Sequence, residues 1–335
     1  MNEAPSGYSL RRPATDDLAA IQAVLDAAES ADLGEPCRHY MDIVVDAATS
    51  RLDLEHGVWM VVAANGDLAA CGWLWEPREG DTEFIVDHYV HPDHRDGPAD
   101  DRLIDALEDT VVRRYAEMPE MTRSLFFSEA TNVRRRASLQ ARGYEHVRDF
   151  YGMRIDLHPG LSPTDWPDGI EARPIRPRED AHLAHEASEE AFSEHFLFGP
   201  TSFEDWSILT FGREDCDPSL WLLAWDGDEV AGQVWAVARD EGGSVEVGLV
   251  EDLSVRMPWR GRGLAAALLA EIFRLLGERG CRITRLFVDV QNTTGALGVY
   301  ERAGMRMERR IEAFARSRNV PTRRRTHRHR RAADR

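Results

Sequence analysis

Residues 250–276, VEDLSVRMPWRGRGLAAALLAEIFRLL, carry the strongest local signal for the fold of this chain. The stretch opens with a short apolar strand, Pro258 stops that strand, and RGRGLA at residues 260–265 turns the chain into a helix. The helix repeats apolar residues at helical spacing, namely Leu264, Leu268, Ile272 and Leu275. A strand, a glycine turn and a helix in this order direct free backbone N–H groups and the positive end of a helix dipole at one point. This arrangement favours a bound pyrophosphate.

The glycines and arginines of the turn fit the same ligand. Gly261 and Gly263 let the backbone approach a phosphate without an intervening Cβ, and Arg260 and Arg262 could add charge-assisted hydrogen bonds. The turn is not a dinucleotide-binding loop of the Rossmann type, because the full glycine spacing and the acidic residue about 20 positions later are missing.

The order of predicted elements occurs twice along the chain, which indicates a tandem duplication. Residues 1–157 and 170–315 each contain a strand, a helix, a hairpin, a strand–turn–helix unit, and a final strand and short helix. The strand–turn–helix units align without gaps at an offset of 165 residues. Residues 158–169, HPGLSPTDWPDG, are rich in proline and glycine and are predicted to be a linker.

Residues 250–276 resemble the cofactor signature of the GNAT superfamily of N-acetyltransferases, with Arg260, Gly263 and Ala265 in the positions that cradle the pyrophosphate of coenzyme A. The segment QNTTGALGVYERAGM, at residues 291–305, resembles the Asn-to-Tyr segment of that family. The duplicated layout is similar to that of the mycothiol synthase group of tandem acetyltransferases. The resemblance implies an α/β (α+β) protein of two tandem GNAT-like domains. Each would have a mixed, mostly antiparallel sheet flanked by helices.

The resemblance also implies roles for single residues. Asn292 would bind the pantetheine arm, and Tyr300 would protonate the departing thiolate, which a phenol can do because an ordinary thiol has a pKa of about 8.5. Backbone N–H groups at residues 253–255 would stabilise the oxyanion. The predicted cofactor-binding residues are Leu253, Ser254, Val255, Arg260, Gly261, Arg262, Gly263, Leu264, Ala265 and Asn292.

Transfer to an amine also needs a base, since most alkylamines are protonated at neutral pH. Glu251 and Asp252 are adjacent on a strand, so their side chains are expected to point to opposite faces, and only one of them would face the substrate. We choose Glu251, because Asp252 has a counterpart in the first half, Asp87. Glu246 remains an alternative.

The first half lacks the predicted catalytic groups. At the offset of 165, Pro98 replaces Gly263 and removes a backbone donor, while Asp100 replaces Ala265 and places a negative charge at the phosphate position. Val86 stands in place of Glu251, and Leu139 stands in place of Tyr300. We therefore expect a degenerate, non-catalytic first domain.

The sequence as a whole predicts an acetyl-CoA-dependent N-acetyltransferase that modifies the primary amine of a small molecule by direct transfer in a ternary complex. A protein N-acetyltransferase and a non-catalytic acyl-CoA sensor are alternatives. We expect no metal and no membrane contact, and a net charge of −18 makes nucleic acid an improbable partner. Residues 316–335 are rich in arginine and are predicted to be a disordered tail. The absence of an apolar leader, together with four scattered cysteines, favours the cytoplasm.

Overall fold

The computed structural model describes residues 7–33, 43–158, 164–240, 246–292 and 294–318. Its strands form one twelve-stranded sheet in the order β1-β2-β3-β4-β5-β12-β6-β11-β10-β9-β8-β7. The first half supplies β1 (Tyr8–Arg11), β2 (Val58–Ala63), β3 (Leu68–Leu74), β4 (Glu83–Val90), β5 (Arg123–Glu129) and β6 (Glu145–Asp156). The second half supplies β7 (Ile170–Pro174), β8 (Trp221–Asp226), β9 (Glu229–Asp240), β10 (Glu246–Val255), β11 (Ile283–Asp289) and β12 (Arg306–Ser317).

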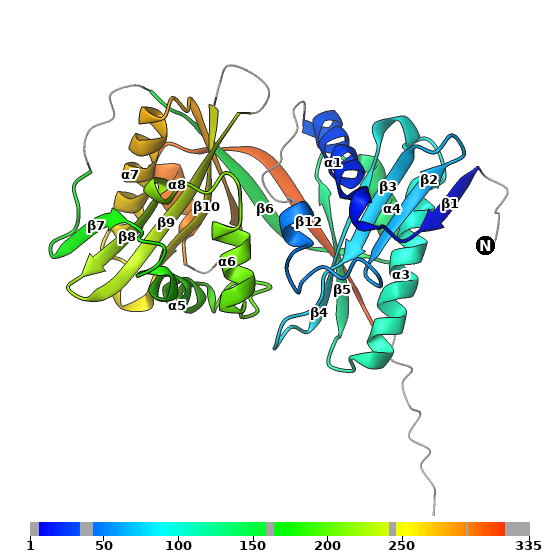
Figure 1. The fold of residues 1–335 in the computed structure, drawn as a ribbon, viewed down its shortest axis with the longest axis horizontal. Helices are drawn as coiled ribbons and strands as arrows, with labels where there is room; N and C mark the ends of the chain where they lie inside the picture. Colours follow the sequence, from blue (N-terminus) through cyan, green and yellow to red (C-terminus); the bar gives the residue numbers. More distant parts are fainter. Residues whose placement is uncertain (1–6, 34–42, 159–163, 241–245, 293, 319–335) are drawn as a thin grey trace, which may run out of the picture.

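Helices cover both faces of the sheet in each half (Figure 1). The first half contains α1 (Leu18–Leu33), α2 (Ile43–Asp46), α3 (Ala99–Glu117) and α4 (Val133–Ala141), and the second half contains α5 (Ala181–Phe192), α6 (Phe203–Phe211), α7 (Leu264–Glu278) and α8 (Ala296–Arg302). Short 3-10 turns are η1 (Thr15–Asp17), η2 (Pro92–His94), η3 (Pro218–Leu220) and η4 (Met257–Trp259). The α7 helix packs its apolar stripe on β8–β11, while α5 and α6 pack on the opposite face.

The structure repeats the same order of elements in both halves. The α3 helix begins at Ala99 and α7 begins at Leu264, and η2 and η4 begin at Pro92 and Met257, so both pairs keep the offset of 165 residues. The predicted fold class is therefore confirmed. Both predicted hairpin turns also form, since Gly66 and Gly227 adopt positive φ values of 93° and 61° between the paired strands.

The two halves exchange their last strands. The β12 strand pairs with β5 of the first half, and β6 pairs with β11 of the second half. The β6 and β12 strands also pair with each other in the middle of the sheet, where Figure 1 shows them running between the two lobes. Phe314 of β12 is fully buried in the core of the first half. The boundary near residue 157 therefore separates the two sequence repeats, but each repeat pairs its last strand with the other half of the sheet.

The predicted linker and tail lie partly outside the described residues. Residues 159–163 of the linker and residues 319–335 of the tail are not described, and β12 extends through Ser317. No described helix has both the length and the apolar character needed to cross a membrane.

Candidate active site

A cleft opens where β10 and β11 separate. These strands pair in parallel only at residues 247–249 of β10. Beyond this point, residues 250, 251 and 253–255 of β10 and residues 286–289 of β11 line a cavity of about 760 Å³. The strand edge of β10 that faces β11 is therefore available to an extended ligand, as in strand addition.

The glycine turn lies at one end of this cleft. Gly261 and Gly263 have φ values of 75° and 84°, and apart from their neighbours in the chain no heavy atom lies within 4 Å of where a Cβ would stand at either position. The first helical hydrogen bond of α7 runs from the N–H of Ala267 to the carbonyl of Gly263 at 3.1 Å. The N–H groups of the first helical turn, which precede that bond, are therefore free to bind an anion. Gly261, Gly263, Leu264 and Ala265 all line the cavity, as the sequence predicts.

The two arginines of the turn make different contacts. Arg260 lines the cavity, but its guanidinium donates to the carbonyl of Ala191 at 3.0 Å and to Glu194 at 2.9 Å, and so joins the turn to the end of α5. Arg262 is not among the lining residues and lies 3.8 Å from Asp226. The structure thus brings together the predicted cofactor-binding residues with the exception of the Arg262 side chain.

A β-bulge at Glu251 changes which way the two adjacent carboxylates point. Val250 pairs with Ala236 and Asp252 pairs with Trp235, so Glu251 has no partner across the ladder. A bulge redirects the side chains that follow it. As a result, Glu251 and Asp252 line the same cavity, and the expectation of opposite faces is wrong.

Both carboxylates are held in a setting that favours the neutral form. Burial raises the pKa of Glu251 to about 7, against the opposing effect of Arg213, whose guanidinium lies 3.1 Å from the carboxylate. Burial raises the pKa of Asp252 to about 6, although Ser188 donates to it at 2.8 Å. A base with a pKa near 7 is well matched to neutral pH. Glu246 begins β10, and its side chain lies outside the described part of the chain.

Tyr300 lies on α8 and lines the cofactor cleft. Burial, together with the charge of Asp252, raises the pKa of its phenol, so the phenol keeps its proton at neutral pH and is a weaker acid than an ordinary tyrosine. The N–H of Met305 donates to the carbonyl of Tyr300 at 3.0 Å, and the N–H of Tyr144 makes the same 3.0 Å bond to Leu139 in the first half. These two equivalent bonds show that Leu139 has the place in the first half that Tyr300 has in the second half.

A second cavity meets the cofactor cleft. It has a volume of about 430 Å³, and three residues line both cavities: Phe192, His195 and Glu251. Its other walls are rich in aromatic side chains, which are Phe196, Phe198, Trp206, Trp221 and Trp235. Sequence reasoning missed Phe192 and His195, because nothing in their local pattern marks them as functional.

The first half contributes to this second cavity. Val45 and Asp46 of α2 line it, as does Arg78 of the β3–β4 connection. Arg78 also donates to the carbonyl of Leu197. The second cavity is thus bounded by both halves of the chain.

Comparison with known proteins decides the family. Residues 181–305 match the model of the Acetyltransferase (GNAT) family. A mycothiol acetyltransferase of Pseudarthrobacter chlorophenolicus is 30% identical over 247 residues, which cover 72% of this chain and 72% of the relative. The chain belongs to the GNAT family.

Further relatives extend this similarity to nearly the whole chain. A mycothiol acetyltransferase of Catenulispora acidiphila is 29% identical over 308 residues, 88% of this chain and 94% of the relative. The crystal structure of a GCN5-related N-acetyltransferase from Sphaerobacter thermophilus has a TM-score of 0.72 at 31% identity and covers 94% of this chain and 97% of its own. The protein is therefore a GNAT N-acetyltransferase, and acetyl-CoA is the co-substrate of this family.

The corresponding cleft of the first half keeps a cavity of about 300 Å³ between β4 and β5, but its walls carry side chains that oppose the cofactor. Arg135 of α4 donates at 2.7 Å to the carbonyl of His88, the counterpart of Leu253 on the open strand edge. Asp100, in the first turn of α3, lies 3.4 Å from the buried His88 imidazole. A guanidinium on the strand edge and a carboxylate at the helix start both oppose the binding of pantetheine and phosphate there.

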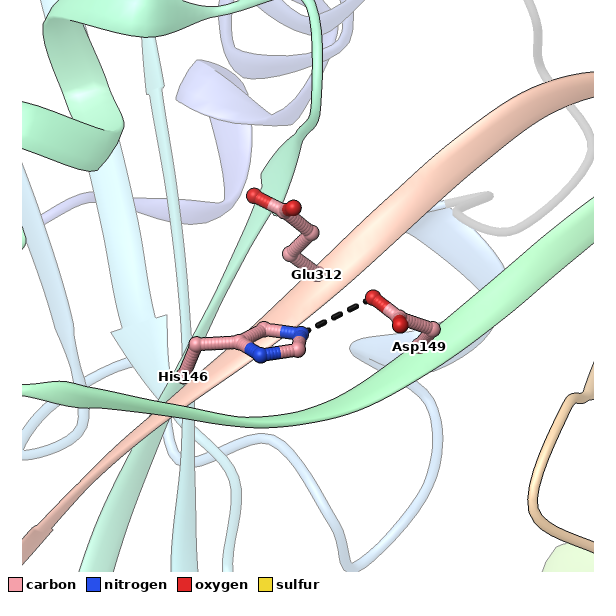
Figure 2. Close-up of side chains that lie close together, drawn as sticks. All are labelled: His146, Asp149 and Glu312. Carbon is pink, nitrogen blue, oxygen red and sulfur yellow. Dashed lines mark hydrogen bonds and ion pairs between the residues drawn. The ribbon is translucent and has the colours of Figure 1, made fainter.

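One cluster in this GNAT enzyme has the spacing of a metal site. The ligand atoms of His146, Asp149 and Glu312 lie within 4.8 Å of one another (Figure 2). However, Arg310 lies 3.0 Å from Asp149 and 3.2 Å from Glu312, and Arg136 lies 2.5 Å from Glu312. Because arginines already neutralise both carboxylates, the cluster is better explained as a link between the exchanged strands β6 and β12.

Proposed function

We propose that this enzyme transfers the acetyl group of acetyl-CoA to the primary amine of a small molecule, by direct attack in a ternary complex. The observation that carries the proposal is the contact between the two cavities at Phe192, His195 and Glu251. Each cavity would hold one substrate, and the thioester and the amine would meet at the shared wall. Direct transfer is also supported by the lining residues described for the two cavities, none of which is a cysteine.

The residues at the shared wall suggest how the reaction proceeds. Glu251 removes a proton from the ammonium group, directly or through water, and the free amine attacks the thioester carbon. Backbone N–H groups of residues 253–255 stabilise the oxyanion. When the intermediate collapses, the C–S bond breaks and Tyr300 gives its proton to the coenzyme A thiolate, while the excess proton on the attacking nitrogen passes through water to the Tyr300 phenolate.

The acceptor-side cavity favours a cationic molecule with apolar faces. Carboxylates outnumber guanidinium groups on its walls, with Asp46, Glu189, Glu251 and Asp252 against Arg78 and Arg213. Aromatic walls suit the carbon skeleton of a sugar or of another ring compound. Because relatives carry the name mycothiol acetyltransferase, the unacetylated form of mycothiol is a candidate acceptor.

Substrate profiling tests this proposal. Release of free thiol from acetyl-CoA should be measured with a panel that contains unacetylated mycothiol, simple alkylamines, aminoglycosides and peptides with free amino termini. We expect turnover with a small amine and initial-rate patterns of a sequential mechanism. Turnover with peptides alone, or ping-pong kinetics, would contradict the proposal.

A further inference from the structure

A hydrogen bond joins the cofactor cleft to the wall of the acceptor cavity. Asn292, just after β11, lies with its Nδ2 at 3.2 Å from Nε2 of His195, just after α5. The Oδ1 atom of Asn292 accepts the N–H of Thr294 at 2.9 Å, which fixes the orientation of the amide. Nδ2 is therefore the donor, and the imidazole of His195 accepts through Nε2.

The same link is present in the degenerate first half, with a different partner. Arg95 donates to the carbonyl of Ala28 in α1, as Arg260 does to that of Ala191 in α5, so these two alanines correspond. Four residues after these alanines lie Asp32 and His195. Asn132, the counterpart of Asn292, donates through Nδ2 to Asp32 at 3.3 Å.

Because both halves keep the link, the hydrogen bond itself serves the fold. What differs is the charge of the acceptor, which is a carboxylate in the degenerate half and an imidazole in the catalytic half. Burial lowers the pKa of His195, so this imidazole is neutral at neutral pH. The charged groups that act on it are Asp289, Arg260, Glu194 and Arg148.

The loop that begins at His195 also shapes the acceptor cavity. The carbonyl of His195 accepts the N–H of Phe198 at 3.1 Å. Between them, Leu197 adopts a φ of 60°, which is an unfavourable conformation for a leucine and persists only when its surroundings impose it. Phe196, Leu197 and Phe198 all line the acceptor cavity. Movement of His195 would therefore change the acceptor wall and the Asn292 turn together.

We propose that His195 is a positioning residue that ties the Asn292 turn to the acceptor loop through a neutral acceptor, and so keeps a further negative charge, beyond those of Asp215 and Asp252, away from Glu251. The inference rests on the proposed role of Glu251 as the base. A carboxylate at position 195 would preserve the link, as Asp32 does, but it would oppose ionisation of Glu251 and repel the anionic cofactor. The groups already acting on Glu251 are Arg213, Arg239 and Asp215.

Three substitutions separate charge from hydrogen bonding. His195→Asp copies the first half, His195→Asn is its neutral isostere, and His195→Ala removes the acceptor. We expect His195→Asn to retain a higher kcat/KM than His195→Asp. His195→Asp should move the acidic limb of the pH profile upward by about one unit. His195→Ala should raise the acceptor KM about tenfold with little change in kcat, because the acceptor loop is no longer held by the hydrogen bond to Asn292. If His195 had only a structural role, the pH profile of His195→Asp would match that of the wild type. An unchanged profile would therefore overturn the proposal.

Binding measurements keep this test independent of the proposed base. Titration calorimetry with acetyl-CoA alone should give a Kd at least about tenfold weaker for His195→Asp than for His195→Asn, and equal values would overturn the proposal. If Glu251→Gln retains the acidic limb, Glu251 is not the base, and the comparison of Kd values still decides the role of His195. Thermal unfolding should give Asp and Asn variants of equal stability, since both keep the hydrogen bond. An unfolded Asp variant beside a folded Asn variant would also overturn the proposal.

Discussion

Replacing Glu251 by Gln removes the predicted base while keeping the size of the side chain. The raised pKa of about 7 means that about a tenth of Glu251 is ionised at pH 6 and about nine tenths at pH 8. We therefore expect kcat/KM of the wild type to rise about tenfold over this range and then to level off. Glu251→Gln should lower the rate by about 10²- to 10⁴-fold near pH 7.

The assay is thiol release from acetyl-CoA across pH 5 to 9 with a fixed amine. The residual rate of Glu251→Gln should follow only the fraction of free amine, so the ratio of wild type to variant isolates the limb that belongs to Glu251. Asp252→Asn is the matched control, because Asp252 lines the same cavity and has a pKa of about 6. A limb near pH 7 that survives Glu251→Gln and disappears in Asp252→Asn would refute the reasoning.

The same pKa predicts a change in stability. Because the pKa of folded Glu251 lies above the ordinary value of 4.5, burial favours the protonated form, and its contribution to stability is lost as the pH rises through about 7. Between pH 4 and pH 8, the wild type should lose up to about 3 kcal/mol of unfolding free energy relative to Glu251→Gln. Urea denaturation at several pH values measures this difference, and parallel curves for the two proteins would contradict it.

Three further predictions follow from the cleft and the exchanged strands. Tyr300→Phe should lower kcat by about 10²- to 10⁴-fold with nearly unchanged acetyl-CoA affinity, and full activity would remove Tyr300 from the mechanism. Calorimetry should show that one chain binds one acetyl-CoA. Gly263→Asp should abolish this binding, the uncharged isostere Gly263→Asn should weaken it less, and Pro98→Gly should leave it unchanged. Two binding sites per chain would contradict a degenerate first cleft. Phe314→Ala should destabilise the protein by about 3 to 5 kcal/mol, because its ring is fully buried in the core of the first half. Hydrogen exchange should increase in the first half, and an increase confined to the second half would contradict that packing.

Features that depend on short stretches of chain could be predicted from the residues alone. The turn at residues 260–265 forms where its glycines predict it, because positive φ values are a local property of glycine. Helical spacing identified the buried face of α7. The gapless offset of 165 identified the duplication and showed that the first half has no glycine at the position equivalent to Gly263.

Features that join distant segments of the chain became visible in the folded structure. The bulge at Glu251 depends on register against β9, and it reversed the sequence-based expectation that Glu251 and Asp252 face opposite sides. The exchange of β6 and β12 leaves no local mark, since either strand could equally pair within its own half. His195 gains its place between two cavities through a contact with Asn292, 97 residues away. Such pairings are set by the packing of the whole chain, which no periodicity or motif records.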